Sequence, residues 1–158
     1  PLAIETSGHA AFKENYYLDD GAYLITKILI SLSHQAKEGK TLTSMIASLK
    51  RPVEENEIRL SFTDDCADFR KDGAFVIEEL KTRAFECGFT VAPDNYEGVR
   101  LNTGEGWILV RMSVHDPVMP VNLESDVKGG NITAAKKLLS LLDGYNFLNL
   151  NNLKNFIL

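Results

Sequence analysis

Two short stretches of the chain carry residue types that could do chemistry. The first, RMSVHDP (residues 111–117), follows the apolar run 107–110 and holds an arginine, a serine and a histidine. An arginine guanidinium presents parallel N–H donors to a phosphate, and backbone N–H groups in a tight turn can point at the same anion. Arg111 and Ser113 are therefore candidates for an anion pocket. The same spacing also fits a plain hairpin loop in which Arg111 pairs with a surface carboxylate.

The second stretch, ETSGH (residues 5–9), offers a carboxylate, a hydroxyl and an imidazole close together. Glu5 and Ser7 could hydrogen-bond neighbouring hydroxyls of a sugar, and His9 could move a proton near neutral pH. A pentamer of this composition is also typical of a loop with a capping role. The residues alone leave both interpretations open.

Length, composition and charge limit the classes of protein to consider. The 158 residues suit one domain of ordinary size, or a small domain with an appendage, and 44% hydrophobic with 25% charged residues is typical of a globular chain. A net charge of -5 argues against general nucleic-acid binding. No apolar run approaches the roughly 18 residues of a membrane span, and no signal segment opens the chain. We expect a cytoplasmic protein, and Pro1 in place of methionine suggests a piece of a longer one.

The cysteines, histidines and paired aspartates give no sign of a metal site. Cys66 and Cys87 lie in unlike settings and are interpreted as free thiols. Asp64 and Asp65 are typical of a turn, since no further acidic ligand follows at fixed spacing. The histidines lie too far apart in sequence for zinc ligands: His9, His34 and His115.

The first third of the chain is predicted to be helical. Apolar residues at helical spacing predict a helix over 19–39, which Asp19 or Asp20 could cap and Gly39 could end. Its apolar stripe consists of Ala22, Ile25, Leu29, Leu32 and Ala36. A second, shorter helix with Thr41 as its cap must stop before Pro52. The polar residues 52–56 are then predicted to link this segment, residues 1–51, to a second domain.

The second domain, predicted over 57–146, alternates strands and helices. The patterns predict strands at 57–62, 98–103, 106–112 and 118–125, and helices at 71–88 and 131–144. This order predicts an α+β fold in which two helices cover a four-stranded, mainly antiparallel sheet. Phe75 and Trp107 are expected in its core. The tail, 147–158, could be a docked helix or an irregular end.

Taken together, the motifs resemble a known family. ETSGH followed by DDGAYLI, and about a hundred residues later GVRL, GWILVR and RMSVHDP, resemble the alpha-D-phosphohexomutases, which include phosphomannomutases, phosphoglucomutases and phosphoglucosamine mutases. In that family four domains surround one deep cleft. The third ends with a G-E-x-S-G-H sugar loop and a D-D-G helix, and the fourth carries an R-P-S-G-T-E-P-like phosphate loop. The resemblance, which extends to about Gly144, implies the end of the third domain plus the fourth.

The resemblance also implies roles for individual residues. Glu5 and Ser7 match the residues that bind sugar hydroxyls, and His9 matches the histidine beside them, a candidate proton shuttle. Arg111 and Ser113 match the arginine and serine that hold the substrate's phosphate.

The chain departs from the family pattern at several positions. Ile4 stands in place of a glycine, and the phosphate loop is changed at Met112, Val114, His115 and Asp116, where the family has proline, glycine, threonine and glutamate. Val114 is less permissive than glycine, whereas His115 could supply a donor in place of the threonine hydroxyl. Both remain among the predicted substrate-binding residues.

Two motifs of the family do not occur in this sequence: the T-A-S-H-N-like loop of the phosphorylated serine and the D-G-D-G-D-R loop that holds magnesium. The resemblance therefore implies a Mg²⁺ ion bound outside these residues and a chain that is inactive alone. Its partners would be a hexose phosphate and the remaining domains, with no nucleic acid and no membrane. The complete enzyme would move a phosphoryl group between the 1- and 6-positions of a hexose. The alternative is a non-catalytic phosphosugar-binding or interaction module.

Overall fold

A computed structural model describes residues 1–5, 8–114 and 116–158 of the chain. The chain forms two compact units, Pro1–Lys50 and Arg51–Leu158. The predicted linker, 52–56, is largely ordered sheet, because strand β3 begins at Glu54 and pairs with β7 from its first residue. The polar composition of this stretch reflects the exposed side of a strand.

The first unit holds a small hairpin and one long helix. Its elements are β1 (Leu2–Ile4), β2 (Ala10–Phe12), the 3-10 helix η1 (Lys13–Asn15), α1 (Gly21–Lys37) and α2 (Leu42–Met45). The predicted first helix is confirmed, and Asp20 caps it by accepting the N–H of Tyr23 at 3.0 Å. Thr41 caps α2, which is a single turn and therefore shorter than the prediction.

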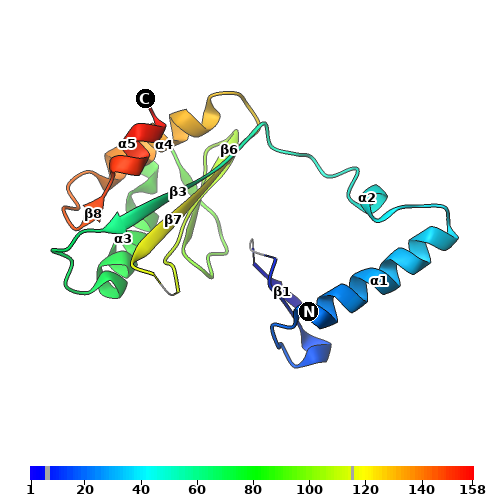
Figure 1. The fold of residues 1–158 in the computed structure, drawn as a ribbon. Coiled ribbons are helices and arrows are strands. Elements are labelled where there is room, and N and C mark those ends of the chain that lie inside the picture. The colour runs from blue at the N-terminus through cyan, green and yellow to red at the C-terminus, as the bar shows by residue number, and fades with distance from the viewer. Residues whose placement is uncertain (6–7, 115) are drawn as a thin grey trace. The chain divides into compact units, whose positions relative to one another are not determined.

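The second unit is a sheet with helices packed against it (Figure 1). Its elements are β3 (Glu54–Phe62), α3 (Phe69–Arg83), the 3-10 helix η2 (Ala84–Cys87), β4 (Thr90–Val91), β5 (Val99–Asn102), β6 (Gly106–Val110), β7 (Val118–Ser125), α4 (Gly130–Leu142), β8 (Leu148–Asn149) and α5 (Asn151–Phe156). The strand order is β4-β5-β6-β7-β3-β8, and all these pairs are antiparallel. The predicted α+β class is confirmed. The sheet has six strands rather than four because two-residue strands extend both edges.

The core lies between one face of this sheet and the helices α3 and α4. Alternate residues of each long strand are fully buried there, such as Leu60 in β3 and Ile108 in β6. Val76 and Leu80 of α3 and Leu138 of α4 cover them. Burial of each such side chain stabilises the fold by about 1.5–3 kcal/mol. Because all the residues of this cluster lie between Ile58 and Leu153, the second unit has a core of its own.

Two side chains predicted in the core lie elsewhere: Trp107 on the open, polar face of the sheet and Phe75 on an exposed side of α3. Trp107 alternates with the buried Ile108, so its ring lies on the open face, where the Arg100 guanidinium stacks over it at 4.7 Å. Phe75 is 52% exposed and packs edge-on against Tyr145.

The segment 147–158, predicted as a tail, is part of the packed domain. Leu148 pairs with Phe62 of β3 and thereby adds β8 to the sheet. Leu153 of α5 is fully buried in the same core. The segment therefore closes one edge of the sheet.

Glu54, inside the predicted linker, caps helix α4 from a distant strand. Its Oε1 accepts the N–H of Gly129 at 2.6 Å, and its Oε2 accepts the N–H of Asn131 at 3.0 Å. These two bonds hold the pKa of Glu54 below its ordinary value of about 4.5. A carboxylate at a helix N-terminus is also favoured by the helix dipole.

We predict that Glu54→Gln lowers the melting temperature of the chain in a pH-dependent way. Because the folded-state pKa is depressed, the stabilisation is present above pH 4.5 and is lost as the pH falls through the lower folded value. Thermal unfolding followed by circular dichroism should show a gap between variant and wild type at pH 7 that closes in acid. Glu55→Gln, at an exposed neighbouring position, is the control. A gap of equal size at pH 7 and pH 3 would contradict this role.

Candidate functional site

The loop 111–117 joins β6 to β7 and is closed by backbone hydrogen bonds. The N–H of Arg111 donates to Pro120 O at 3.2 Å, and that of Ser113 donates to Val118 O at 3.0 Å. At the far end, the N–H of Val118 donates to Asp116 O at 2.8 Å. These bonds fix where the loop leaves and rejoins the sheet.

The Ser113 hydroxyl stabilises the loop as an acceptor, and its own hydrogen remains able to donate. Its Oγ accepts the N–H of Asp116 at 3.2 Å, which leaves the hydroxyl hydrogen for another acceptor. Val114, at the loop tip, is 73% exposed. His115, the remaining predicted residue of this loop, lies outside the described residues.

Arg111 extends from the end of β6 on the open face of the sheet. No ion pair involves its guanidinium among the residues that the structure describes. The described residues therefore do not show the alternative arrangement, in which a surface carboxylate holds Arg111.

The carboxylate that faces Arg111 across the sheet already has other partners. Glu57 accepts Nε of Arg59 at 3.0 Å and Nδ2 of Asn122 at 3.2 Å. These bonds, led by the one from Arg59, lower the pKa of Glu57, and the positive charge of Arg111 adds to the effect. Glu57 therefore attracts Arg111 without occupying its donors.

The hairpin of the first unit gathers the other predicted site residues. The N–H of Glu5 donates to His9 O, and the N–H of Gly8 donates to Glu5 O, both at 3.0 Å. The imidazole of His9 lies between two carboxylates, with Nδ1 3.9 Å from Glu5 and Nε2 4.0 Å from Asp19. Ser7 lies outside the described residues. The structure thus brings Glu5 and His9 together and adds Asp19, which sequence reasoning treated as a helix cap.

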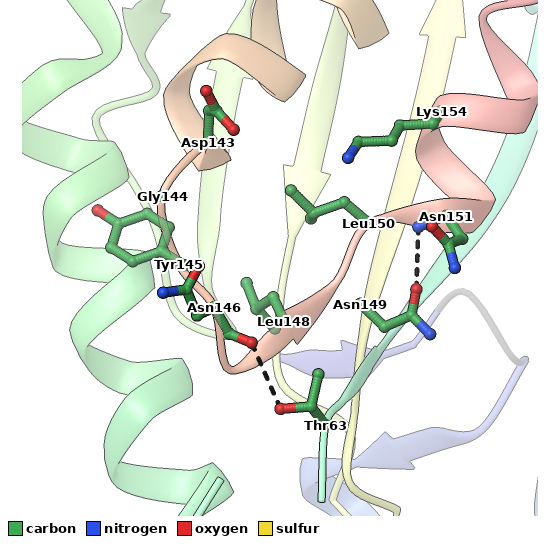
Figure 2. Close-up of a pocket in the computed structure, with 10 residues that line it drawn as sticks. All are labelled: Thr63, Asp143, Gly144, Tyr145, Asn146, Leu148, Asn149, Leu150, Asn151 and Lys154. Atoms are coloured by element: carbon green, nitrogen blue, oxygen red, sulfur yellow. Dashed lines mark hydrogen bonds between the residues drawn. The ribbon is translucent and has the colours of Figure 1, made fainter. Parts of the chain in front are cut away.

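A separate cavity of about 300 Å³ lies beside β8 and α5 (Figure 2). Its lining includes Thr63, Asn146, Asn149 and Lys154 and none of the predicted site residues that the structure describes. Two hydrogen bonds join residues of this lining: Thr63 Oγ1 donates to Asn146 O at 3.4 Å, and the N–H of Asn151 donates to Asn149 Oδ1 at 3.0 Å. The first of these bonds ties the C-terminal segment to the end of β3, and the second lies within that segment.

Neither a metal centre nor a membrane segment emerges from the described part of the chain. Within residues 1–5, 8–114 and 116–158, no three His, Cys, Asp or Glu side chains are grouped so that they could hold a metal ion. Over the same ranges, no helix has the length and apolar character needed to cross a membrane.

Sequence reasoning missed the residues around the loop that come from other elements. Arg70, on α3, contacts the loop at Val114, and Glu57, bonded to Asn122 on the neighbouring strand, feels the charge of Arg111. No local pattern marks them, because each is defined by a neighbour far away in the sequence.

Comparison with known proteins gives a consistent result. The chain is 32% identical over 126 residues to a phosphomannomutase/phosphoglucomutase of Pseudomonas putida, a match that covers 79% of this chain and 25% of that protein. It is 31% identical over 137 residues to a probable phosphoglucosamine mutase of Methanocella arvoryzae, covering 86% of this chain and 27% of that one. No family model matches the chain.

A solved structure supports the fold independently of the sequence match. A phosphoglucomutase/phosphomannomutase family protein of Burkholderia thailandensis superposes with a TM-score of 0.61 at 24% identity, over 90% of this chain and 28% of that one. The chain spans about a quarter of the length of the curated relatives that it matches. Because the sequence matches and the fold both extend over most of its residues, the chain belongs to the phosphohexomutase family.

Proposed function

We propose that the chain is the C-terminal part of a phosphohexomutase, and that its loop 111–117 binds the non-reacting phosphate of a hexose phosphate. The observation that carries this proposal is Arg111, whose guanidinium stands at the start of a closed loop with no ion-pair partner in the described part of the chain. A guanidinium so placed can bind two phosphate oxygens at once. The Ser113 hydroxyl supplies a further donor, and Val114 and His115 complete the loop.

The hairpin of the first unit is the proposed sugar-binding element. Glu5 and Ser7 would bind sugar hydroxyls, and His9 would lie beside them and could move a proton. The proximity of the His9 imidazole to the carboxylates of Glu5 and Asp19 supports this role, since the carboxylates can hold the ring in place.

In this proposal the phosphoryl-transfer chemistry belongs to the rest of the complete protein. A phosphorylated serine and a Mg²⁺ ion would be supplied outside these residues, and the described residues offer no ligand cluster for that ion. The complete cytoplasmic enzyme would interconvert hexose 1- and 6-phosphates. The chain's contribution is to clamp the phosphate that does not react, which uses remote binding energy to orient the reacting end.

The exposed apolar surface of α1 supports the view that more of a domain packs against the first unit. Ile25, Leu29 and Leu32, predicted as an inward stripe, are 58%, 57% and 40% exposed, and no described residue of α1 is buried. A continuous apolar face of this kind is typical of a surface that other protein covers. We propose that the remainder of the third domain covers it.

A second candidate function is a phosphosugar-binding module without mutase activity. Val114, which replaces the glycine of the family loop, favours it, because a branched side chain restricts the backbone at the loop tip.

The test is an assay of the complete protein with Mg²⁺ for conversion of glucose 1-phosphate and mannose 1-phosphate to the 6-phosphates. We expect turnover by the complete protein and none by the 158-residue chain. Binding of either sugar phosphate without turnover would select the module. Neither binding nor turnover would overturn the proposal.

A further inference from the structure

The loop 111–117 rests on the first turns of helix α3 at two points. The side chain of Met112 packs so closely on Gly73 that a methyl group there would collide with the Met112 sulfur. One turn earlier, Nη2 of Arg70 donates to the carbonyl oxygen of Val114 at 3.5 Å. Residues 70 and 73 are three apart and therefore lie on the same side of the helix. This side of α3 therefore packs against the loop.

The Arg70 guanidinium is held in this place by aromatic contacts. It stacks over the ring of Phe69 at 4.8 Å, and that ring packs against Phe62 at 5.8 Å. The N–H of Phe62 donates to Pro117 O at 3.1 Å, at the other end of the loop. The elements that fix Arg70 thus also fix the loop.

Arg70 keeps its charge available. No carboxylate forms an ion pair with it over the described ranges. Its bond to Val114 O is at the long end of the hydrogen-bond range and goes to a neutral acceptor. A phosphate oxygen is the stronger acceptor for a guanidinium, so the side chain can exchange one for the other.

The charge of the loop gives a reason for a second cation. Asp116 lies within the loop, and Asp68 caps the neighbouring helix by accepting the N–H groups of Arg70 and Lys71. A dianionic phosphate in a loop that carries a carboxylate of its own is bound more tightly if a second cation offsets the repulsion.

We propose that Arg70, contributed by helix α3 beside Val114, is a second phosphate-binding guanidinium of this site. The inference rests on the proposed function of the loop. It explains how a loop with valine in place of glycine can still hold a phosphate: a side chain from outside the loop supplies a donor that the altered loop does not.

The experiment compares the affinity of the 158-residue chain and its variants for inorganic phosphate and glucose 1-phosphate, followed by NMR shifts of the loop amides. Arg70→Ala should weaken binding about three- to tenfold, in line with a partly exposed charge-assisted bond. Arg70→Lys should recover part of this loss, since it keeps the charge but not the planar fork. Lys71→Ala is the matched control, because it removes the same charge from the same helical turn and has no side-chain contact with the loop over the described ranges.

The possible outcomes distinguish the role of Arg70 from the phosphate-binding role of the loop itself. Equal losses of affinity in Arg70→Ala and Lys71→Ala would show that Arg70 acts only through its long-range charge, and would overturn the inference. Unchanged affinity in Arg70→Ala, with binding abolished in Arg111→Ala, would also overturn it while leaving the proposed function intact. No binding by the wild-type chain would overturn the proposed function itself.

Discussion

Replacing Arg111 with alanine should reduce the affinity of the chain for glucose 1-phosphate by about tenfold to a hundredfold, the effect of losing a charge-assisted, bidentate arginine–phosphate contact. The fold should persist, because the guanidinium forms no ion pair among the described residues. The measurement is isothermal titration calorimetry on wild type and variant, with thermal unfolding as the check on folding.

Two further variants sharpen the Arg111 prediction. Arg111→Lys should recover only part of the affinity, since an ammonium cannot bond two oxygens in the planar geometry of a guanidinium. Arg100→Ala removes a guanidinium of the same sheet face that stacks over Trp107, and it should leave binding nearly unchanged. Equal losses in Arg111→Ala and Arg100→Ala would show that the sheet attracts anions by net charge alone.

Gly98→Ala should damage both stability and binding. Gly98 has φ +149°, and a Cβ there would collide with the carbonyl oxygen of Val110 and come within 2.9 Å of Cα and Cβ of Arg111. Strain and collision together should lower the free energy of unfolding by about 2–4 kcal/mol. Phosphate binding should fall as well, because relief of the collision requires Arg111 to move.

Gly104→Ala is the matched control for this prediction. Gly104 also has positive φ, +88°, but a Cβ there would have no neighbour within 4 Å. Its loss should be limited to the backbone term of about 1–2 kcal/mol, with binding intact. Chemical denaturation of both variants gives the comparison. If both lose the same stability and both still bind phosphate, Gly98 is a turn glycine with no bearing on Arg111.

Periodicity predicted the helices and long strands of this chain because each is defined by residues close together in sequence. The helix capped by Asp20 and the strand 118–125 both lie where their patterns placed them. Strand β8 has two residues and no pattern of its own, so the closure of the sheet by the C-terminal segment could not be predicted. It depends on pairing with Phe62, far away in the chain.

The two aromatic errors have different causes. Alternation with Ile108 places Trp107 on the opposite face of β6. The strand periodicity therefore predicts its position correctly, whereas the hydrophobicity of the side chain alone wrongly placed it in the core. Phe75 precedes Val76 on α3, and the buried side of that helix is formed by Gly73, Val76 and Leu80, which leaves Phe75 half exposed.

The candidate site was predictable where it is a local motif and not where it is an assembly. Arg111 and Ser113 are neighbours in sequence, and the resemblance to a family assigned them a role. Arg70 is 44 residues from Val114, and its contact depends on how α3 packs under the loop. Glu57 likewise faces Arg111 only after β7 has paired with the strands on either side of it.

The most direct test of the proposed phosphate site is to locate the bound phosphate. A ¹H–¹⁵N titration of the 158-residue chain with glucose 1-phosphate compares the loop 111–117 with the cavity beside β8. We expect saturable shifts at the amides of Ser113, Val114 and Asp116 that disappear in Arg111→Ala. Shifts centred on Asn146 and Asn149, or loop shifts that persist in Arg111→Ala, would contradict it.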